Sequence, residues 1–138
     1  MAFHPQSFAS RTILLVEDEP FVRDATRRIL QNAGFRVICA ADAQEALAAC
    51  GQASEGIDVL MTDLVLPGRS GLELAHDARI RAATTQVLLT SGYGEGVSEC
   101  LESGTHFLAK PYSRQSLLEK IEEVLSVRCF ERAAGQAS

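Results

Sequence analysis

The sequence contains five short apolar segments, and four of them are followed directly by a charged or polar side chain. The segments are rich in leucine and β-branched residues, a composition typical of strands buried on both faces. They cover residues 12–16, 37–40, 57–62, 86–90 and 106–109. Stretches with apolar residues at helical spacing separate them, and strands that alternate with helices form parallel sheets through right-handed crossovers. We therefore expect an α/β fold, with helices on both faces of a doubly wound parallel sheet.

The expected helices carry residues typical of helix ends. Pro20 stands at a first helical position, where its missing N–H is harmless, and Gly34 follows the expected end of that helix. Asp42 and Glu45 have the spacing of a capping box, and Ser113 is a typical residue before a helix. The pattern predicts helices over residues 20–33, 43–50, 71–81, 95–103 and 114–127.

Length and charge limit the class of protein. A chain of 138 residues fits one domain, which we place at residues 11–127, between a flexible N-terminal lead (1–10) and a flexible C-terminal tail (128–138). The net charge of −5 argues against nucleic-acid binding, which needs a basic face. The chain has no leader pattern and no apolar run of membrane-spanning length, so we expect a cytoplasmic protein without membrane contact.

Some apolar side chains are expected in the core. The four cysteines are widely separated and form no CxxC pair, which favours small buried hydrophobes in a reducing compartment over a zinc or redox site. Phe21 is expected to be a core residue, with a docking contact for a partner helix as the alternative.

The polar strand ends define the candidate site. The carboxyl ends of parallel strands share one edge, where ligands bind in such sheets, so the side chains there should converge: Glu17, Asp18, Asp63, Ser91 and Lys110. Three neighbouring carboxylates repel one another and would favour a bound divalent cation, Mg²⁺ or Mn²⁺ by their all-oxygen ligands. The cation, the Lys110 ammonium and the Ser91 hydroxyl would then surround a phosphoryl group, with Asp63 as the nucleophile.

Two enzyme or cofactor classes fit less well. A small metal-dependent hydrolase on the same scaffold would need a second acid or base, and Val65 stands two residues after the nucleophile, where such a group could lie. A flavin-binding protein would need a hydroxyl- and glycine-rich loop after the first strand, where residues 17–20 read EDEP.

Four separated motifs resemble a known family. They are LLVEDE (14–19), MTDLVLPGRSG (61–71), LLTSGY (88–93) and LAKPY (108–112), in the order and spacing of the receiver domain of two-component response regulators. The resemblance covers residues 11–127 and extends to receivers of hybrid sensor kinases. It implies a flavodoxin-like (βα)5 fold with strand order 2-1-3-4-5. A pseudo-receiver that binds partners without phosphate is disfavoured, because none of the pocket groups is missing.

The resemblance also implies a role for each site residue. Glu17, Asp18, Asp63 and the backbone carbonyl of Val65 would bind Mg²⁺ (or Mn²⁺), and Asp63 would accept the phosphoryl group. Lys110 would contact the phosphate, Ser91 would be the switch hydroxyl and Phe107 the switch aromatic; a cis peptide would join Lys110 to Pro111.

The implied partners are a histidine kinase or a histidine phosphotransfer protein, and a downstream protein target or a second copy of the chain. The domain would be a signalling switch and not a metabolic enzyme. Phe107 departs from the common pattern because it lacks the tyrosine hydroxyl. Because Val65 has no polar group to orient water and Tyr93 could shade the site, we expect slow loss of the phosphoryl group.

Overall fold

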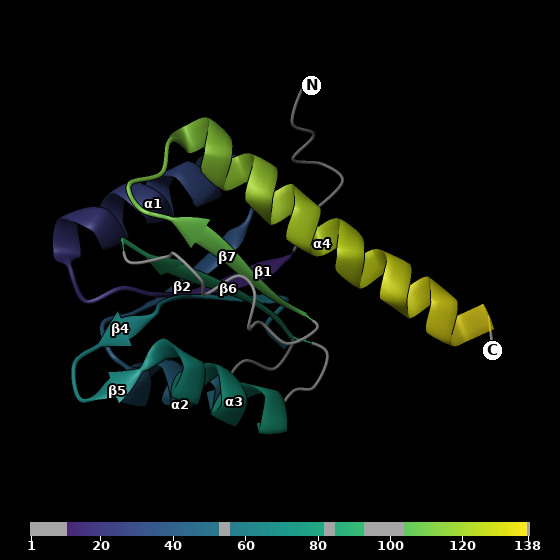
Figure 1. The fold of residues 1–138 in the computed structure, drawn as a ribbon, viewed down its shortest axis with the longest axis horizontal. Coiled ribbons are helices and arrows are strands. Elements are labelled where there is room, and N and C mark those ends of the chain that lie inside the picture. The colour runs from purple at the N-terminus through teal and green to yellow at the C-terminus, as the bar shows by residue number, and fades with distance from the viewer. Residues whose placement is uncertain (1–10, 53–55, 82–84, 93–103, 138) are drawn as a thin grey trace.

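The computed structural model describes residues 11–52, 56–81, 85–92 and 104–137. Its central sheet has five parallel strands in the order β2-β1-β3-β6-β7 (Figure 1). The bounds are β1 Thr12–Val16, β2 Arg36–Ala40, β3 Val59–Asp63, β6 Gln86–Ser91 and β7 Thr105–Ala109. In chain order of the sheet strands this is 2-1-3-4-5, so the flavodoxin-like prediction is confirmed.

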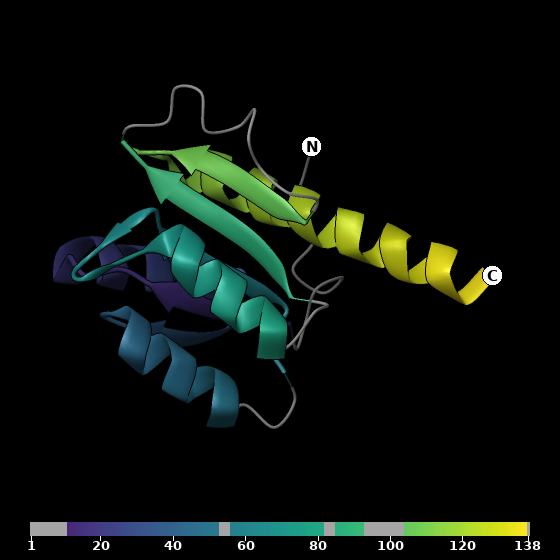
Figure 2. The same cartoon turned by 60° about the horizontal axis from the view of Figure 1, so that its bottom comes forward.

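Helices cover both faces of the sheet, and each pair encloses its own part of the core. The helices are α1 Pro20–Asn32, α2 Ala43–Gln52, α3 Gly71–Arg81 and α4 Arg114–Ala137. As Figures 1 and 2 show, α1 and α4 lie on one face and α2 and α3 on the other. Buried residues of β1 alternate between the two layers, since Ile13 and Leu15 pack in the first and Leu14 and Val16 in the second. This alternation explains why the strands read as continuous apolar runs.

The predicted helix-end signals operate as expected. Gly34 follows α1 with a φ of 102°, a left-handed conformation that glycine adopts readily. Before α2, the Asp42 carboxylate accepts a hydrogen bond from the Glu45 N–H at 2.8 Å. Before α4, the Ser113 hydroxyl accepts one from the Ser116 N–H at 3.0 Å.

The chain after β3 contains two short strands that the sequence pattern did not predict. β4 (Val65–Leu66) and β5 (Arg69–Ser70) pair antiparallel and form a hairpin, here called the acceptor hairpin. Its turn contains Gly68 at φ 72°. The expected loop is therefore an ordered element that leads directly into α3.

Other differences concern boundaries and exposure. α4 continues to Ala137, so the backbone is helical through the residues expected to form a flexible tail. The flexibility of this tail stays a prediction. Phe21 is 85% exposed, and the prediction that it belongs to the core is wrong. Cys39 is exposed on the edge strand β2, so the prediction that the cysteines are buried is wrong for this residue. The helix expected over residues 95–103 and the lead at residues 1–10 lie outside the described residues. Among the described helices, none has the length and apolar character to cross a membrane.

Candidate phosphoacceptor and metal site

Strand alternation brings three of the predicted site residues to one side of the sheet edge. Glu17 follows β1 and extends its ladder, because its N–H donates to the Ala40 carbonyl at 3.0 Å. Asp63 ends β3, and Lys110 follows β7. The residues two positions earlier in each strand pack in the layer under α1 and α4: Leu15, Met61 and Leu108. Since side chains alternate with a period of two, the three polar residues project toward that same layer.

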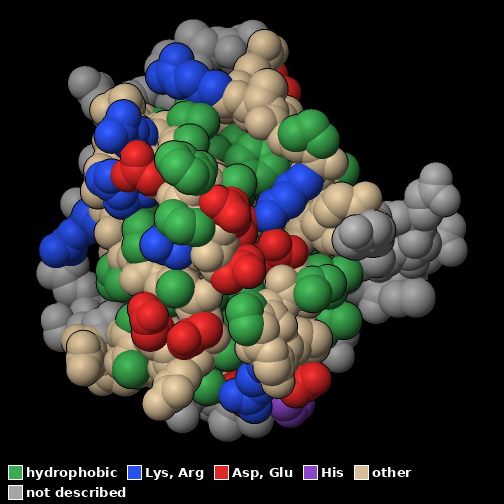
Figure 3. Space-filling model, turned by 90° about the vertical axis from the view of Figure 1, so that its left-hand side faces the viewer, with side chains coloured by type: hydrophobic (Ala, Val, Ile, Leu, Met, Phe, Trp, Pro, Cys, Tyr) green, Lys and Arg blue, Asp and Glu red, His purple; other side chains and the backbone are tan. Residues whose placement is uncertain are grey.

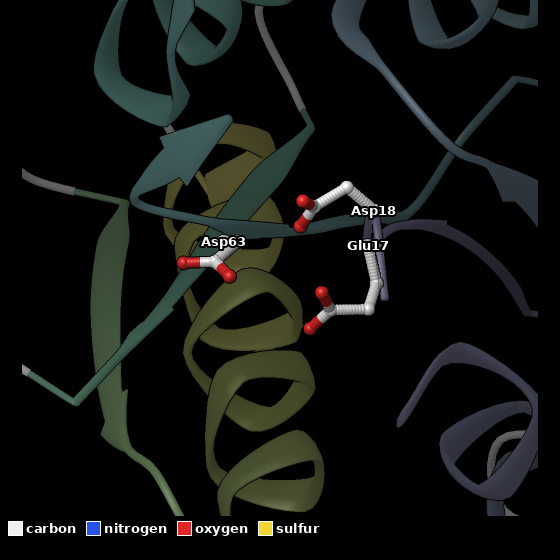
Figure 4. A group of neighbouring side chains, drawn as sticks. All are labelled: Glu17, Asp18 and Asp63. Atoms are coloured by element: carbon white, nitrogen blue, oxygen red, sulfur yellow. The ribbon is translucent and has the colours of Figure 1, made fainter. Parts of the chain in front are cut away.

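The acidic side chains converge as predicted. One carboxylate oxygen from each of Glu17, Asp18 and Asp63 lies within 4.8 Å of the others. Figure 4 shows the carboxylates of Glu17 and Asp18 pointing toward Asp63 from the end of the neighbouring strand. Figure 3 shows acidic side chains gathered at the centre of this face with a basic side chain beside them.

Lys110 connects two of these carboxylates. Its Nζ donates to Glu17 Oε1 at 2.5 Å and to Asp63 Oδ2 at 2.8 Å. Burial lowers the pKa of Lys110, but the hydrogen bonds to Asp63 and Glu17 raise it, and the pKa ends above its ordinary value. The ammonium is therefore fully charged at neutral pH.

Backbone and side-chain donors fix the orientation of Glu17 and Asp63. The Val65 N–H donates to Asp63 Oδ1 at 3.2 Å. The Glu19 N–H donates to Glu17 Oε2 at 3.1 Å, and the Arg23 guanidinium donates to the Glu17 carbonyl oxygen at 2.8 Å. Sequence reasoning did not identify Arg23, because nothing in a helix-face arginine indicates a backbone acceptor six positions earlier. The bonds from Val65 and Glu19 orient two carboxylates that repel each other, and the bond from Arg23 fixes the backbone that carries Glu17.

The donor set fits a hard divalent cation. Three carboxylates against one ammonium leave an excess of negative charge within a few ångströms, and oxygen ligands are those that Mg²⁺ and Mn²⁺ prefer. Glu17 is 3% exposed, whereas Asp18 is exposed to solvent. A cation held here could therefore keep water ligands on its outer side, as Mg²⁺ usually does.

The two predicted switch residues lie on neighbouring strands. Ser91 ends β6 and is 2% exposed, and its backbone carbonyl accepts the Lys110 N–H at 3.0 Å. Phe107 is half-buried in β7 and packs against the layer under α2 and α3. Ser91 pairs with Ala109, two residues after Phe107, so the two switch candidates lie close together in the sheet. The peptide bond between Lys110 and Pro111 is cis, as the resemblance implied.

The acceptor hairpin and α3 approach the backbone of Asp63 very closely. A Cβ at Gly71 would lie 2.2 Å from the Asp63 carbonyl oxygen, and the Gly71 N–H donates to the Leu64 carbonyl at 2.7 Å. Only glycine allows the start of α3 to lie against the end of β3 in this way. The sequence contains the glycine, but the reason for it appears only in the structure.

A cavity of about 640 Å³ adjoins the site on the side of α1. Its lining is mostly apolar: Phe21, Val22, Ala25, Thr26, Ile29, Gly92, Lys110, Pro111 and Tyr112. At its base the hydroxyls of Thr26 and Tyr112 share a hydrogen bond of 2.8 Å. We call this feature the α1 groove; Lys110 belongs both to it and to the acidic site.

Comparison with known proteins agrees with this geometry. The sequence profile of the response regulator receiver domain matches residues 13–122. The chain belongs to the receiver domain family. A receiver domain from the hybrid histidine kinase CckA has 37% sequence identity and a TM-score of 0.74, covering 83% of this chain and 98% of that one. A CheY-like receiver from Methanospirillum hungatei has 30% identity and a TM-score of 0.79, covering 89% and 99% of the two chains.

Relatives of this receiver are larger proteins. A cyclic di-GMP phosphodiesterase of Thermotoga maritima is 34% identical over 122 residues, which are 86% of this chain and 32% of the relative. Across the curated relatives compared, the match spans between 13% and 54% of the relative's length. In each of these relatives the match covers only part of a longer chain, and the matched part is a receiver domain, a signalling switch.

Proposed function

We propose that Asp63 accepts a phosphoryl group from a phosphohistidine on a histidine kinase or a histidine phosphotransfer protein. One observation carries the proposal. Asp63 accepts a hydrogen bond from the Lys110 ammonium at 2.8 Å, lies beside the carboxylates of Glu17 and Asp18, and accepts one from the Val65 N–H on its other oxygen at 3.2 Å. A carboxylate with these neighbours can act as a nucleophile, because the ammonium and a bound cation would stabilise the phosphoryl oxygens.

The proposed transfer needs only the phosphohistidine donor and a proton from solvent. A carboxylate oxygen of Asp63 forms a bond to phosphorus while the bond from phosphorus to the donor's imidazole nitrogen breaks. The electron pair of that bond stays on the nitrogen, which takes a proton from water. Lys110 would stabilise charge on the transferred group and remain paired with it afterwards.

A divalent cation would contribute to the same site. Glu17, Asp18, Asp63 and the backbone carbonyl of Val65 would hold Mg²⁺ or Mn²⁺. When bound, the cation would neutralise negative charge on the phosphoryl oxygens.

The conformational response would begin at Ser91. Its hydroxyl would turn toward the phosphoryl group, and Phe107 would move inward against the layer that it already contacts. A phenylalanine ring cannot donate a hydrogen bond, so packing alone would hold the Phe107 ring in its switched position. A downstream protein or a second copy of the chain would read the change.

The phosphorylated state should be long-lived in the absence of partners. Val65, two residues after the acceptor, is 62% exposed and offers no side-chain group to activate a water molecule. We expect hydrolysis over minutes or longer for the purified protein with Mg²⁺. Loss of the phosphoryl group within seconds would contradict this expectation.

The experiment that tests the proposal uses phosphoramidate, a small donor with a P–N bond. The purified protein should gain the mass of one phosphoryl group when Mg²⁺ is present and much less when a chelator removes it. Glu17→Gln and Asp18→Asn should raise the Mg²⁺ concentration that gives half-maximal phosphorylation. Asp42→Asn, at the cap of α2, should behave as wild type. Absence of any mass gain in wild type with Mg²⁺ would favour a receiver that acts without phosphate.

A further inference from the structure

We propose that Arg69 is a positioning residue for the phosphoacceptor: it joins the acceptor hairpin to α3 and so holds the Val65 N–H against Asp63. The inference rests on the proposed role of Asp63 and extends it to a residue outside the acidic cluster. Val65 begins β4 only two residues after Asp63, and its N–H holds Asp63 Oδ1 at 3.2 Å. The position of the hairpin therefore sets the orientation of the acceptor carboxylate.

The acceptor hairpin cannot hold its position alone. Each of its strands has two residues, and their pairing is limited to Val65 with Ser70 and Leu66 with Arg69. Even a longer isolated two-stranded hairpin is only marginally stable in water. Its place must come from contacts with the rest of the domain.

At the base of the hairpin, Leu64 is held by the Gly71 N–H on its carbonyl and by the Thr90 carbonyl on its N–H. Two further contacts fasten the strands themselves. Leu66 is 5% exposed and packs in the layer under α2 and α3, which anchors the first strand. On the second strand, the Arg69 guanidinium forms an ion pair through Nη2 with the Asp77 carboxylate, and its Nε lies 3.7 Å from Glu73 Oε2. Glu73 and Asp77 are one turn apart on α3, so they present their carboxylates on one side of the helix. The planar guanidinium of arginine suits such a pair of acceptors.

The free energy of the Arg69–Asp77 ion pair determines which properties of the domain it can change. The side chains of Arg69 and Asp77 are 37% and 29% exposed, and ion pairs with this exposure contribute at most about 1 kcal/mol. That is too little to decide whether the domain folds. It is enough to change the population of one hairpin position by up to about fivefold. A role in positioning would therefore show at the acceptor site and hardly at all in global stability.

Electrostatics without positioning makes a different prediction. If Arg69 acted only as a positive charge near the acidic cluster, Arg69→Gln would tighten Mg²⁺ binding. By the same reasoning Asp77→Asn, which removes a negative charge, would weaken it. If the pair positions the hairpin, both substitutions release it, and both should act in the same direction.

The test compares Arg69→Gln, Asp77→Asn and the double variant with wild type. The control is Lys120→Gln, which removes an i,i+3 ion pair with Glu123 on α4. The measurements are the Mg²⁺ dissociation constant, the rate of phosphoryl uptake from phosphoramidate, the Val65 amide hydrogen-exchange rate by NMR, and the urea midpoint.

We expect both single variants to weaken Mg²⁺ binding and to speed Val65 exchange by up to about fivefold, the factor that corresponds to ~1 kcal/mol. Phosphoryl uptake should slow by a similar factor, the double variant should be no worse than either single one, and Arg69→Lys should recover part of the loss. Urea midpoints and the Lys120→Gln control should match wild type.

Opposite effects of Arg69→Gln and Asp77→Asn on Mg²⁺ affinity, or unchanged Val65 exchange in both, would overturn the proposal. A failure of the proposed function is distinguishable from this result. In that case wild type itself takes up no phosphoryl group, while the exchange rate of Val65 still reports whether Arg69 holds the hairpin.

Discussion

Lys110 Nζ lies 2.8 Å from Asp63 Oδ2 and 2.5 Å from Glu17 Oε1, so a single ammonium bridges the ends of β3 and β1. The same ammonium competes with any divalent cation for these two carboxylates. It therefore stabilises the domain without metal and opposes the binding of metal. The two effects can be separated by one substitution.

Lys110→Met should weaken the metal-free domain and strengthen its binding of Mg²⁺. Loss of the charged hydrogen bonds should lower the free energy of unfolding by about 1.5–3 kcal/mol. Loss of the like charge should tighten Mg²⁺ binding by roughly tenfold, equivalent to ~1.4 kcal/mol. Urea unfolding with and without Mg²⁺, together with a calorimetric Mg²⁺ titration, measures both. Unchanged Mg²⁺ affinity would show that the ammonium does not compete for this site.

Gly71→Ala should destabilise the domain and disturb Asp63. The added Cβ would lie 2.2 Å from the Asp63 carbonyl oxygen, a contact with backbone that cannot move aside cheaply. We expect a loss of about 1–3 kcal/mol, typical of overpacking. Gly51→Ala is the matched control, because nothing lies within 4 Å of its new Cβ and alanine favours helices by about 0.5–1 kcal/mol. Urea midpoints that shift equally in both variants would contradict the close approach.

Tyr112→Phe should lower the free energy of unfolding by an amount that depends on pH. Below pH 10 the variant should be less stable by about 1 kcal/mol, because Thr26 loses its hydrogen-bond partner. Burial raises the pKa of Tyr112 above 10.0, although the bond with Thr26 lowers it. The folded state therefore favours the neutral phenol. The contribution of Tyr112 to the free energy of unfolding is full below pH 10 and is lost as the pH rises through the pKa of Tyr112 in the folded state.

The measurement for Tyr112→Phe is urea unfolding at several pH values on both sides of the phenol pKa. The stability difference from wild type should narrow on the alkaline side. The other tyrosine, Tyr93, is present in both proteins, so its titration cancels in the comparison. A constant difference across the range would mean that Tyr112 titrates alike in the folded and unfolded chains.

Phe21→Ser should slow transfer from a protein donor and leave transfer from a small donor unchanged. The ring is 85% exposed at the edge of the α1 groove, which adjoins Lys110, and aromatic side chains in such places often dominate binding. We expect roughly tenfold slower transfer from the phosphorylated partner. Leu72→Ser is the control, since Leu72 is 50% exposed on α3 outside the groove. Equal slowing by both variants, or slowing with phosphoramidate too, would contradict a docking role.

Local patterns in the sequence were sufficient to predict the sheet and the converging strand ends. Apolar runs and helix-end residues act over a few positions, so strands such as Thr12–Val16 and the cap at Asp42 could be read directly. The parallel arrangement then required Asp63 and Lys110 to share an edge. Their contact across 47 positions follows from topology.

The remaining features depend on contacts that no local pattern records. The acceptor hairpin has strands of two residues, too short for an alternating pattern to be visible. Thr26 and Tyr112 are 86 positions apart, and neither residue type predicts the other. Phe21 looks apolar enough for the core, but its position lies on the opposite side of α1 from the buried Thr26 and Leu30.

The most direct test of the central claim is intact mass spectrometry of wild type and Asp63→Asn after incubation with phosphoramidate and Mg²⁺. Wild type should gain the mass of one phosphoryl group, and the variant, which lacks the acceptor carboxylate but keeps its size, should gain none. A phosphoryl-sized gain on Asp63→Asn equal to that of wild type would contradict the assignment of Asp63 as the acceptor.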